Sequence, residues 1–300
     1  MAIETEFAEL HPSERVSSET KTRASRRGGA SLYLIAIYGV LIVAAIIALV
    51  PFLYVVSTSF KDTVALFKYP PEWIPSEPTL INFQELVQDY PFLRWTLNSF
   101  IVASTATIIK VIIDAMAGYA FAKMTFPGKD ALFLVVLMTL MVPFAATLIP
   151  LFIIVRDLHL TNTYIGLILP ALASPIGIFM MRQFIETLAA DLENAARLDG
   201  CSEFQIFRRV ILPLVRPGLV VLGVFTFMTQ WTSYLWPLVI GTKEEMFTLT
   251  VGVQSLRSLF TVNWGVLSAG AVLSMLPLVL VFLFLQRYFI AGSIAGALKE

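Results

Sequence analysis

Six long apolar runs constrain what this chain can fold into. Each is about 20 residues long, which is the length an α-helix needs to cross the hydrocarbon core of a bilayer. Because lipid offers no hydrogen-bond partners to the backbone, such runs must pair their own polar groups, as helices do. The sequence therefore predicts an all-α integral membrane protein with six transmembrane helices. Their expected bounds are about 31–56, 95–118, 131–155, 164–183, 217–240 and 265–287.

The composition agrees with a membrane protein and argues against other classes. Hydrophobic residues make up 57% of the chain and charged residues 14%, against about 45–50% and about 25% in soluble domains. The formal net charge is zero, so we expect no nucleic-acid partner, since such partners attract basic proteins. The single cysteine, Cys201, excludes an intrachain disulfide.

The basic residues predict the orientation of the chain. Most of its 21 Lys and Arg residues lie in segments on the same side of the membrane as the N-terminus. Cytoplasmic segments carry this excess in membrane proteins, so we expect both termini in the cytoplasm. Residues 1–30 are predicted to form a disordered cytoplasmic tail, and residues 31–300 a single transmembrane domain. The latter part of FTLTVGVQSL (247–256), in an outer loop, is expected to form a short helix.

Prolines within the apolar runs predict bends in the spans. A proline leaves one carbonyl of its helix unpaired and displaces the preceding turn. The residues concerned are Pro143, Pro150, Pro170, Pro175 and Pro277.

The segment from about 186 to 216 is polar, in contrast to the apolar runs on both sides of it. Its Arg residues place it on the cytoplasmic face. The spacing of its apolar residues predicts two short helices joined by a turn. Because both ends are attached to membrane spans, such a helix pair is suited to transmit force into the membrane.

Local signals mark the turn between these two helices. Gly200 stands where a helix C-cap favours a left-handed residue, and Ser202 with Gln205 has the form of a capping box. Pro213 is expected to end the second helix. The apolar stripes are predicted to consist of Leu188, Leu192, Ala195 and Ala196 in the first helix and Phe204, Phe207 and Ile211 in the second.

This segment resembles the EAA loop in the membrane subunits of bacterial ABC importers, the binding-protein-dependent transport family. The pattern of that loop is Glu-Ala-Ala, three residues, Gly, nine residues, then Ile, any residue and Leu-Pro. Ala195 and Ala196 precede Gly200 at the family spacing, and Leu212 with Pro213 completes the pattern.

Two positions depart from the family pattern. Val210 replaces the Ile, and Asn194 stands at the Glu position, with Glu193 one place earlier. One residue corresponds to about 100° of rotation on a helix, so Glu193 cannot simply take the place of the motif's Glu.

The resemblance extends over nearly the whole chain after residue 30, and it is to the maltose-type permease subunits of ABC sugar importers. Local matches follow one another in the family's order. They are SFK (59–61), PPEW (70–73), FLRWTLNS (92–99), GYAFAKMTFPGK (118–129), TLIPLF (147–152), LTNTYIGLILP (160–170) and QRYFIAGSIAGALK (286–299).

The resemblance implies a type I ABC importer permease fold in the bacterial inner membrane and transport of a sugar or related carbohydrate into the cell. It implies three kinds of partner: a second homologous permease subunit, two copies of a P-loop ATPase subunit and an extracytoplasmic solute-binding protein. The 188–213 helices would couple to the ATPase. The coupling residues carried over from the motif are Asn194, Ala195, Ala196, Asp199, Gly200, Leu212 and Pro213.

No catalytic or cofactor site is expected in the chain itself. It lacks a GxxxxGK[ST] phosphate loop, so ATP and Mg²⁺ would belong to the partner ATPase and this subunit would not be an enzyme. With His11 and His159 as its two histidines, we expect no metal site.

One polar stretch inside the fifth predicted span is a candidate substrate pathway. QWTSYLWPL (230–238) resembles a Trp-Asn-Glu-Phe-Leu-x-Pro-Leu stretch of the family, with replacements at several positions. A mixture of polar and aromatic side chains can bind sugar hydroxyls and stack on sugar rings. Packing between helices explains the same residues equally well. The candidates are Gln230, Trp231, Ser233 and Tyr234.

Lys110 and Asp114 form a second polar feature, on one face of the second predicted span. Ionisable residues inside a membrane are costly and often functional. One interpretation is structural, in which they pair with each other or with a neighbouring helix. The other is an ion-coupled secondary transporter that uses the two residues as a relay and needs no ATPase partner.

Overall fold

The computed structural model describes residues 12–257 and 262–297, and the regular elements of this part are helices. By its contacts the chain divides into two compact units, Met1–Ser57 and Thr58–Glu300. Within the described residues, three helices are long and apolar enough to cross a membrane, or up to six if each of three bent helix pairs counts as one span.

The first unit consists of most of α2 (Pro12–Ser59). Its apolar part, Tyr33–Ser59, is 27 residues long and overlaps all but the first two residues of the first predicted span. The helix begins earlier than predicted, because residues 12–30 are helical rather than disordered. Pro12 is well placed at the start of a helix, and the Glu, Lys, Arg and Ala residues that follow have high helix propensity. Residues 1–11 of the predicted tail lie outside the described residues.

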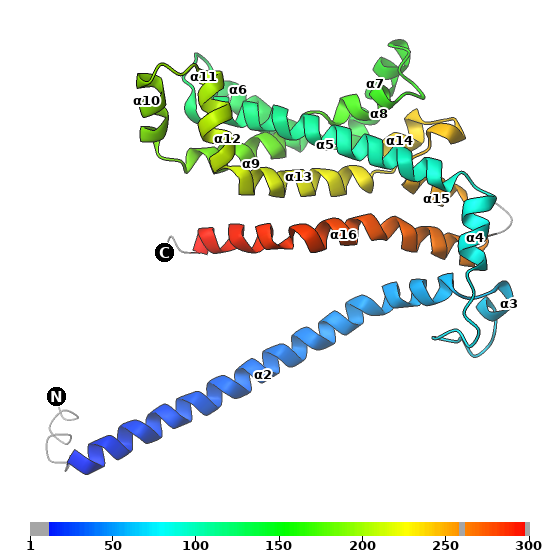
Figure 1. Ribbon diagram of the computed structural model, residues 1–300, viewed down its shortest axis with the longest axis horizontal. Coiled ribbons are helices and arrows are strands. Elements are labelled where there is room, and N and C mark those ends of the chain that lie inside the picture. The colour runs from blue at the N-terminus through cyan, green and yellow to red at the C-terminus, as the bar shows by residue number, and fades with distance from the viewer. Residues whose placement is uncertain (1–11, 258–261, 298–300) are drawn as a thin grey trace. The chain divides into compact units, whose positions relative to one another are not determined.

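The second unit is organised around α5 (Phe92–Lys123), which contains the second predicted span. Two further helices, α9 (Pro175–Glu186) and α13 (Arg216–Trp231), pack along it, and α13 also packs against α16 (Trp264–Ala297) (Figure 1). Helix α16 contains the sixth predicted span. The loop before α5 holds α3 (Thr63–Leu66) and α4 (Ile81–Gln88).

Glycines bring α9 close to its two neighbours. A Cβ atom on Gly118 of α5 would lie 2.7 Å from Cβ of Met181 in α9, and one on Gly218 of α13 would lie 2.8 Å from the ring of Phe184. Small residues allow such close approach between membrane helices, where van der Waals packing is a main source of association. The three helices therefore form the packed centre of this unit.

The third and fourth predicted spans are broken helices rather than straight ones. In the third, α6 (Lys129–Met138) and the 3-10 helix η1 (Thr139–Met141) meet α7 (Phe144–Asp157) at 101°. In the fourth, α8 (Tyr164–Ile168) and the 3-10 helix η2 (Leu169–Ala171) meet α9 at 50°.

The predicted proline bends are confirmed at three of the five positions. Pro143 precedes α7, Pro170 lies in η2 and Pro175 begins α9, so each stands at a break. Pro150 and Pro277 lie inside α7 and α16. Since proline lacks an amide N–H, a break is favoured where other groups can replace the lost backbone bond.

The fifth predicted span, 217–240, is also not one helix. Helix α13 ends at Trp231, and α14 (Leu235–Ile240) begins after a three-residue break. Pro237 cannot donate to the carbonyl of Ser233, and that carbonyl accepts a hydrogen bond of 2.6 Å from the hydroxyl of Thr250 instead. The bond from a distant residue stabilises the break.

The loop after α14 folds back onto α5. It contains the 3-10 helix η4 (Glu244–Met246) and α15 (Leu249–Ser255), which confirms the short helix predicted there. The side chain of Asn98 donates to the carbonyls of Glu245 at 2.8 Å and Phe247 at 2.9 Å. These bonds fix the loop to the first half of α5.

The close contact of α5 with α9 is testable by adding one methyl group. Gly118→Ala is expected to destabilise the protein by about 1–3 kcal/mol, because overpacking forces neighbouring atoms to move, here Cβ of Met181 and the backbone nitrogen of Arg182 at 2.8 Å. The measurement is the thermal unfolding midpoint of the purified protein in detergent.

Gly223→Ala is the matched control for this prediction. It makes the same change in α13, where the nearest side-chain atom, on Val111, lies 3.9 Å from the added Cβ. The midpoint should stay the same or rise slightly, since Ala favours helix more than Gly does. Equal midpoints for the two variants would contradict the close packing of α5 and α9.

Candidate functional site

The polar segment 186–216 forms the predicted pair of helices with a turn. Its helices are α10 (Ala190–Leu198), α11 (Glu203–Ile206), the π-helical turn η3 (Phe207–Ile211) and α12 (Leu212–Leu214). Gly200 has a φ of 82° in the turn. Ser202 and Gln205 form the capping box. The amide of Ser202 donates 2.8 Å to the side-chain oxygen of Gln205, and the amide of Gln205 donates 3.4 Å to the hydroxyl of Ser202. These local predictions are confirmed.

Pro213 does not end the second helix, contrary to the sequence prediction. It lies within α12, and the chain leaves the helix at Val215, where it bends by 81° into α13. The π-helical turn η3 comes directly before it. In a normal α-helix the ring of Pro213 would collide with the carbonyl four residues earlier. The wider π-helical turn displaces that carbonyl, so the helix continues through Pro213.

The helix pair has its predicted apolar stripes in part, since Leu188, Ala196, Phe207 and Ile211 pack in the core. Its buried apolar residues pack on α5 and α9, and they are Ala196, Ile206, Phe207 and Ile211. The predicted stripe residues Leu192, Ala195 and Phe204 are exposed, Phe204 by 61%. Leu198 is also exposed, by 89%. The helix pair therefore leaves three large apolar side chains uncovered on this chain, Leu192, Leu198 and Phe204.

A buried charge lies on the inner face of α10. Glu193 is only 2% exposed, and its carboxylate lies 3.1 Å from the ammonium group of Lys123, the last residue of α5. The same ammonium group donates 2.6 Å to the carbonyl of Leu188. Glu193 thus occupies the inner face of α10, and Asn194 faces outward, as the rotation between successive helix residues requires.

Further charged contacts continue from Glu193 to α11. Arg197 lies 3.6 Å from Glu193 and donates 2.7 Å to the carboxylate of Glu203, which also accepts 2.6 Å from the hydroxyl of Tyr119 on α5. Arg197 first, and then Tyr119, hold the pKa of Glu203 below its usual value. These contacts join both coupling helices to the end of α5.

The remaining predicted coupling residues lie at or near the surface. Asp199 is the C-cap of α10 and is exposed, like Gly200 in the turn. Leu212 is half-buried and Pro213 is exposed.

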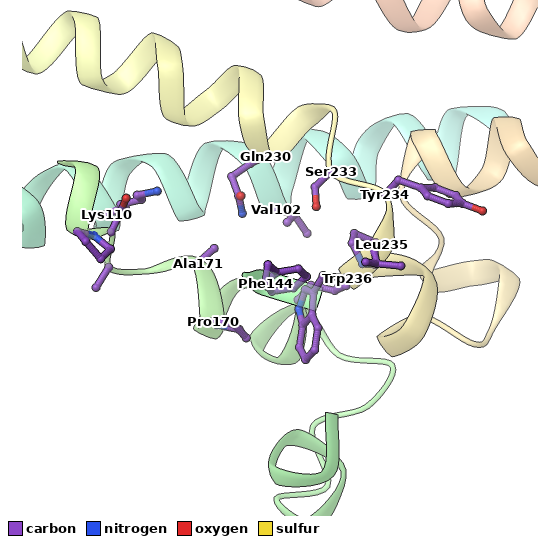
Figure 2. A pocket seen from close by; sticks show the side chains of 15 residues that line it. Val102, Lys110, Phe144, Pro170, Ala171, Gln230, Ser233, Tyr234, Leu235 and Trp236 are labelled. Carbon is purple, nitrogen blue, oxygen red and sulfur yellow. The ribbon is translucent and has the colours of Figure 1, made fainter. Parts of the chain in front are cut away.

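A pocket of about 410 Å³ lies where two helix breaks face α5. One wall comes from the break before α9, with Pro170, Ser174 and Pro175, and another from the break between α13 and α14. Figure 2 shows Gln230 and Ser233 between Lys110 on one side and Tyr234 on the other. The pocket therefore combines an ammonium, an amide, hydroxyls and aromatic rings.

Three of the four predicted pathway residues line this pocket, and Trp231 does not. Gln230, Ser233 and Tyr234 are lining residues. Trp231 is 2% exposed, stacks on Phe227 and donates 3.0 Å to the carbonyl of Ser274 in α16. It therefore joins α13 to α16 within the core, as the packing interpretation of this stretch predicted.

Trp236 lines the pocket although sequence reasoning did not select it. Its ring nitrogen donates 3.1 Å to the carbonyl of Gly166, and Phe144 packs edge-on against its ring. The signal was present, because Trp236 lies in the same QWTSYLWPL stretch. Choosing it over Trp231 required knowledge of the break between α13 and α14.

Asp114 and Lys110 have different surroundings. Asp114 is fully buried, and its carboxylate accepts 3.1 Å from the amide of Ser174, at the N-terminus of α9. Gly177 makes room for it, since a Cβ there would collide with the carboxylate. A carboxylate at a helix N-terminus is stabilised by the helix dipole. Asp114 thus fixes α5 to the start of α9, whereas Lys110 lines the pocket.

This combination of a helical membrane chain, a polar pocket between broken spans and a helix pair at the end of α5 defines a transport permease. Residues 114–292 match the family described as the binding-protein-dependent transport system inner membrane component. The chain belongs to this family.

Relatives with known names are similar over most of the chain. The arabinooligosaccharides transport system permease protein AraQ of Halalkalibacterium halodurans is 37% identical, over 85% of this chain and 92% of that protein. The lactose transport system permease protein LacG of Rhizobium radiobacter is 34% identical, over 87% of this chain and 95% of that protein. Both are permeases of the kind that the sequence resemblance implied.

The fold has a close counterpart among solved structures. A bacterial ABC transporter involved in the import of the acidic polysaccharide alginate contains a chain that matches with a TM-score of 0.79 and 24% sequence identity. The match covers 86% of this chain and 96% of that chain. The predicted ABC importer permease fold is thereby confirmed.

Family membership decides several of the sequence predictions. The chain is an inner-membrane permease component of an ABC importer, and it works with an ATPase and a substrate-binding protein. The family is a transport component and not itself the ATPase. The ion-coupled alternative has no support, and Asp114 already has a structural role at α9.

The ion pair of Glu193 with Lys123 makes a prediction about stability. Breaking a buried pair from one side costs about 3–5 kcal/mol, because it leaves an uncompensated charge. Glu193→Gln should therefore lower the thermal unfolding midpoint strongly. Lys123→Met combined with Glu193→Gln should recover part of the loss, since the unpaired ammonium group is gone.

Asp157→Asn is the control for this pair. It breaks the ion pair with Arg156, in which both side chains are exposed, and exposed pairs contribute only about 0–1 kcal/mol. If the double variant proves no more stable than Glu193→Gln alone, the unpaired charge of Lys123 is not the cause of the loss.

Proposed function

We propose that this chain and a second homologous permease subunit form the membrane path of an ATP-driven importer for a sugar or related carbohydrate. Relatives named for arabinooligosaccharide and lactose transport support this substrate class. In the proposed assembly an extracytoplasmic binding protein delivers the sugar. Two copies of a P-loop ATPase subunit supply the ATP and Mg²⁺, and both termini of this chain lie in the cytoplasm.

The pocket is the observation that carries this proposal. Its volume of about 410 Å³ lies within the range of about 300–1,000 Å³ that is usual for small-molecule sites. Gln230 and Ser233 can bond sugar hydroxyls, and Trp236 offers an aromatic face on which a sugar ring can stack. Such side chains are costly inside a membrane unless they meet polar partners, and a sugar is such a partner.

The helix breaks around the pocket suit a transport path that opens alternately to the two sides of the membrane. Transporters commonly bind substrates where membrane helices are discontinuous. Here the breaks at Ser174 and Ser233 both border the pocket. Movement of α9 or α14 about these breaks changes the pocket walls and leaves the helices themselves intact.

The helices of 188–213 are the proposed docking element for the ATPase. Their exposed apolar residues Leu192, Leu198 and Phe204 supply area to bury against a partner, and the exposed Ala195 permits close approach. Asn194 stands outward where the family motif has Glu, so its contact with the ATPase would be polar rather than charged. Arg197 donates 3.2 Å to Asn194 and orients its side chain.

Helix α5 provides the route from the ATPase to the pocket. At one end, Lys123 and Tyr119 hold the coupling helices. Further along the same helix, Lys110 and Val102 line the pocket. Because a helix is stiff along its axis, a displacement of the coupling helices reaches the pocket wall directly.

Gly200 offers a test of coupling. Its φ of 82° is strained for a β-branched residue but is accessible to Asn, and nothing lies within 4 Å of an added Cβ. Gly200→Ile should leave membrane insertion intact and abolish ATP-driven uptake in cells, whereas Gly200→Asn should retain most of it. Normal uptake with Gly200→Ile would remove the proposed coupling role of this turn.

The proposed path is tested by uptake into proteoliposomes that contain the full assembly, with ATP inside and labelled arabinooligosaccharide or lactose outside. Gln230→Ala and Ser233→Ala should each raise the KM about 2- to 10-fold, the effect of one lost hydrogen bond of about 0.5–1.5 kcal/mol. The ATPase should remain bound, because neither residue belongs to the coupling helices of 188–213.

Thr232→Ala is the matched control for the pathway residues. Thr232 lies between them in sequence but does not line the pocket, and its hydroxyl donates to the carbonyl of Met228 in the last turn of α13. Its KM should be unchanged. Uptake that tolerates both Gln230→Ala and Ser233→Ala would place the sugar path elsewhere.

A further inference from the structure

We infer that the carbohydrate carried through the pocket bears an acidic group, with Lys110 as its counter-charge. The inference rests on the proposed function and adds a substrate class to it. Uronic acids and sulfonated sugars share the required chemistry, which is an anionic group attached to a hydroxyl-rich ring.

The charge of the pocket wall is the first observation. Lys110 is the one charged side chain among the residues that line the pocket. It lies near the middle of α5, well away from both ends of that helix. A cation at such a position is costly, and an anion bound in the pocket lowers that cost.

Asp114 lies one helical turn away and its charge favours that of Lys110, but its carboxylate bonds the start of α9 and does not line the pocket. It is absent from the pocket wall and fully buried, with one carboxylate oxygen bonded to the amide of Ser174 at the start of α9. Among the described residues, no ion pair within 4.0 Å joins Lys110 to a carboxylate. A ligand in the pocket therefore meets the ammonium group and not the carboxylate.

The order of groups along the pocket indicates how the ligand would lie. Figure 2 shows Lys110 on one side of the pocket, Gln230 and Ser233 in the middle, and Tyr234 on the far side. The acidic group would bind Lys110, the hydroxyls would bond Gln230 and Ser233, and the ring at the other end would meet the aromatic side chains. A sugar with an ammonium group would be repelled by Lys110.

The experiment measures binding by calorimetry to the full assembly in lipid nanodiscs at low salt. The probes are matched disaccharides that differ only in their acidic groups: cellobiouronic acid, with one carboxylate, against cellobiose, and digalacturonic acid, with two carboxylates, against digalactose. At least one acidic member should bind about 10-fold more tightly than its neutral partner, a difference of about 1.4 kcal/mol.

Two variants assign the effect to Lys110. Lys110→Gln should remove the preference for the acidic member, whereas Lys110→Arg should keep it. Thr232→Ala is the control: Thr232 does not line the pocket, so this variant should leave the acidic preference intact. Intact ATPase activity shows that each variant assembly is folded.

The possible outcomes separate this inference from the proposed function. If neutral sugars bind as tightly as their acidic partners, or if the preference survives Lys110→Gln, the inference is wrong while the sugar path stands. If no carbohydrate of either kind binds the pocket, the inference and the proposed path fail together.

Discussion

A helix that breaks inside a bilayer must pair the backbone groups it frees, and the rest of this structure depends on how that is done. At the start of α9, the amide of Ser174 is bonded by Asp114 from α5. At the start of α14, the carbonyl of Ser233 is bonded by Thr250. In both cases a side chain from a distant element fixes the break. The pocket lies between these two breaks, so its shape depends on the same bonds.

Helix α5 connects the two candidate sites because it contributes residues to both. Its last turn holds the coupling helices through Lys123 and Tyr119, and its middle part holds α9 through Asp114 and lines the pocket through Lys110. The packing at Gly118 keeps α9 against this helix. A movement that begins at the coupling helices therefore has a continuous packed path to the pocket.

Predictions from the sequence succeeded where the determining interactions are local. The capping box at Ser202 and the left-handed turn at Gly200 follow from residues a few places apart, and both are present. They failed where a partner comes from far along the chain. Glu193 is buried and pairs with Lys123 on another helix, whereas Leu192 and Phe204 of the predicted stripes are exposed. No spacing within the segment itself contains that information.

The sequence by itself determined the apolar runs, the family and the local turns, because hydrophobic length, motif spacing and capping depend on neighbouring residues. Only the tertiary structure decided which runs break and which of two nearby tryptophans, Trp231 or Trp236, faces the pocket. It also gave Lys110 and Asp114 separate surroundings although they share one face of α5. These outcomes depend on hydrogen bonds and packing between helices that are distant in sequence, and those contacts exist only once the helices assemble.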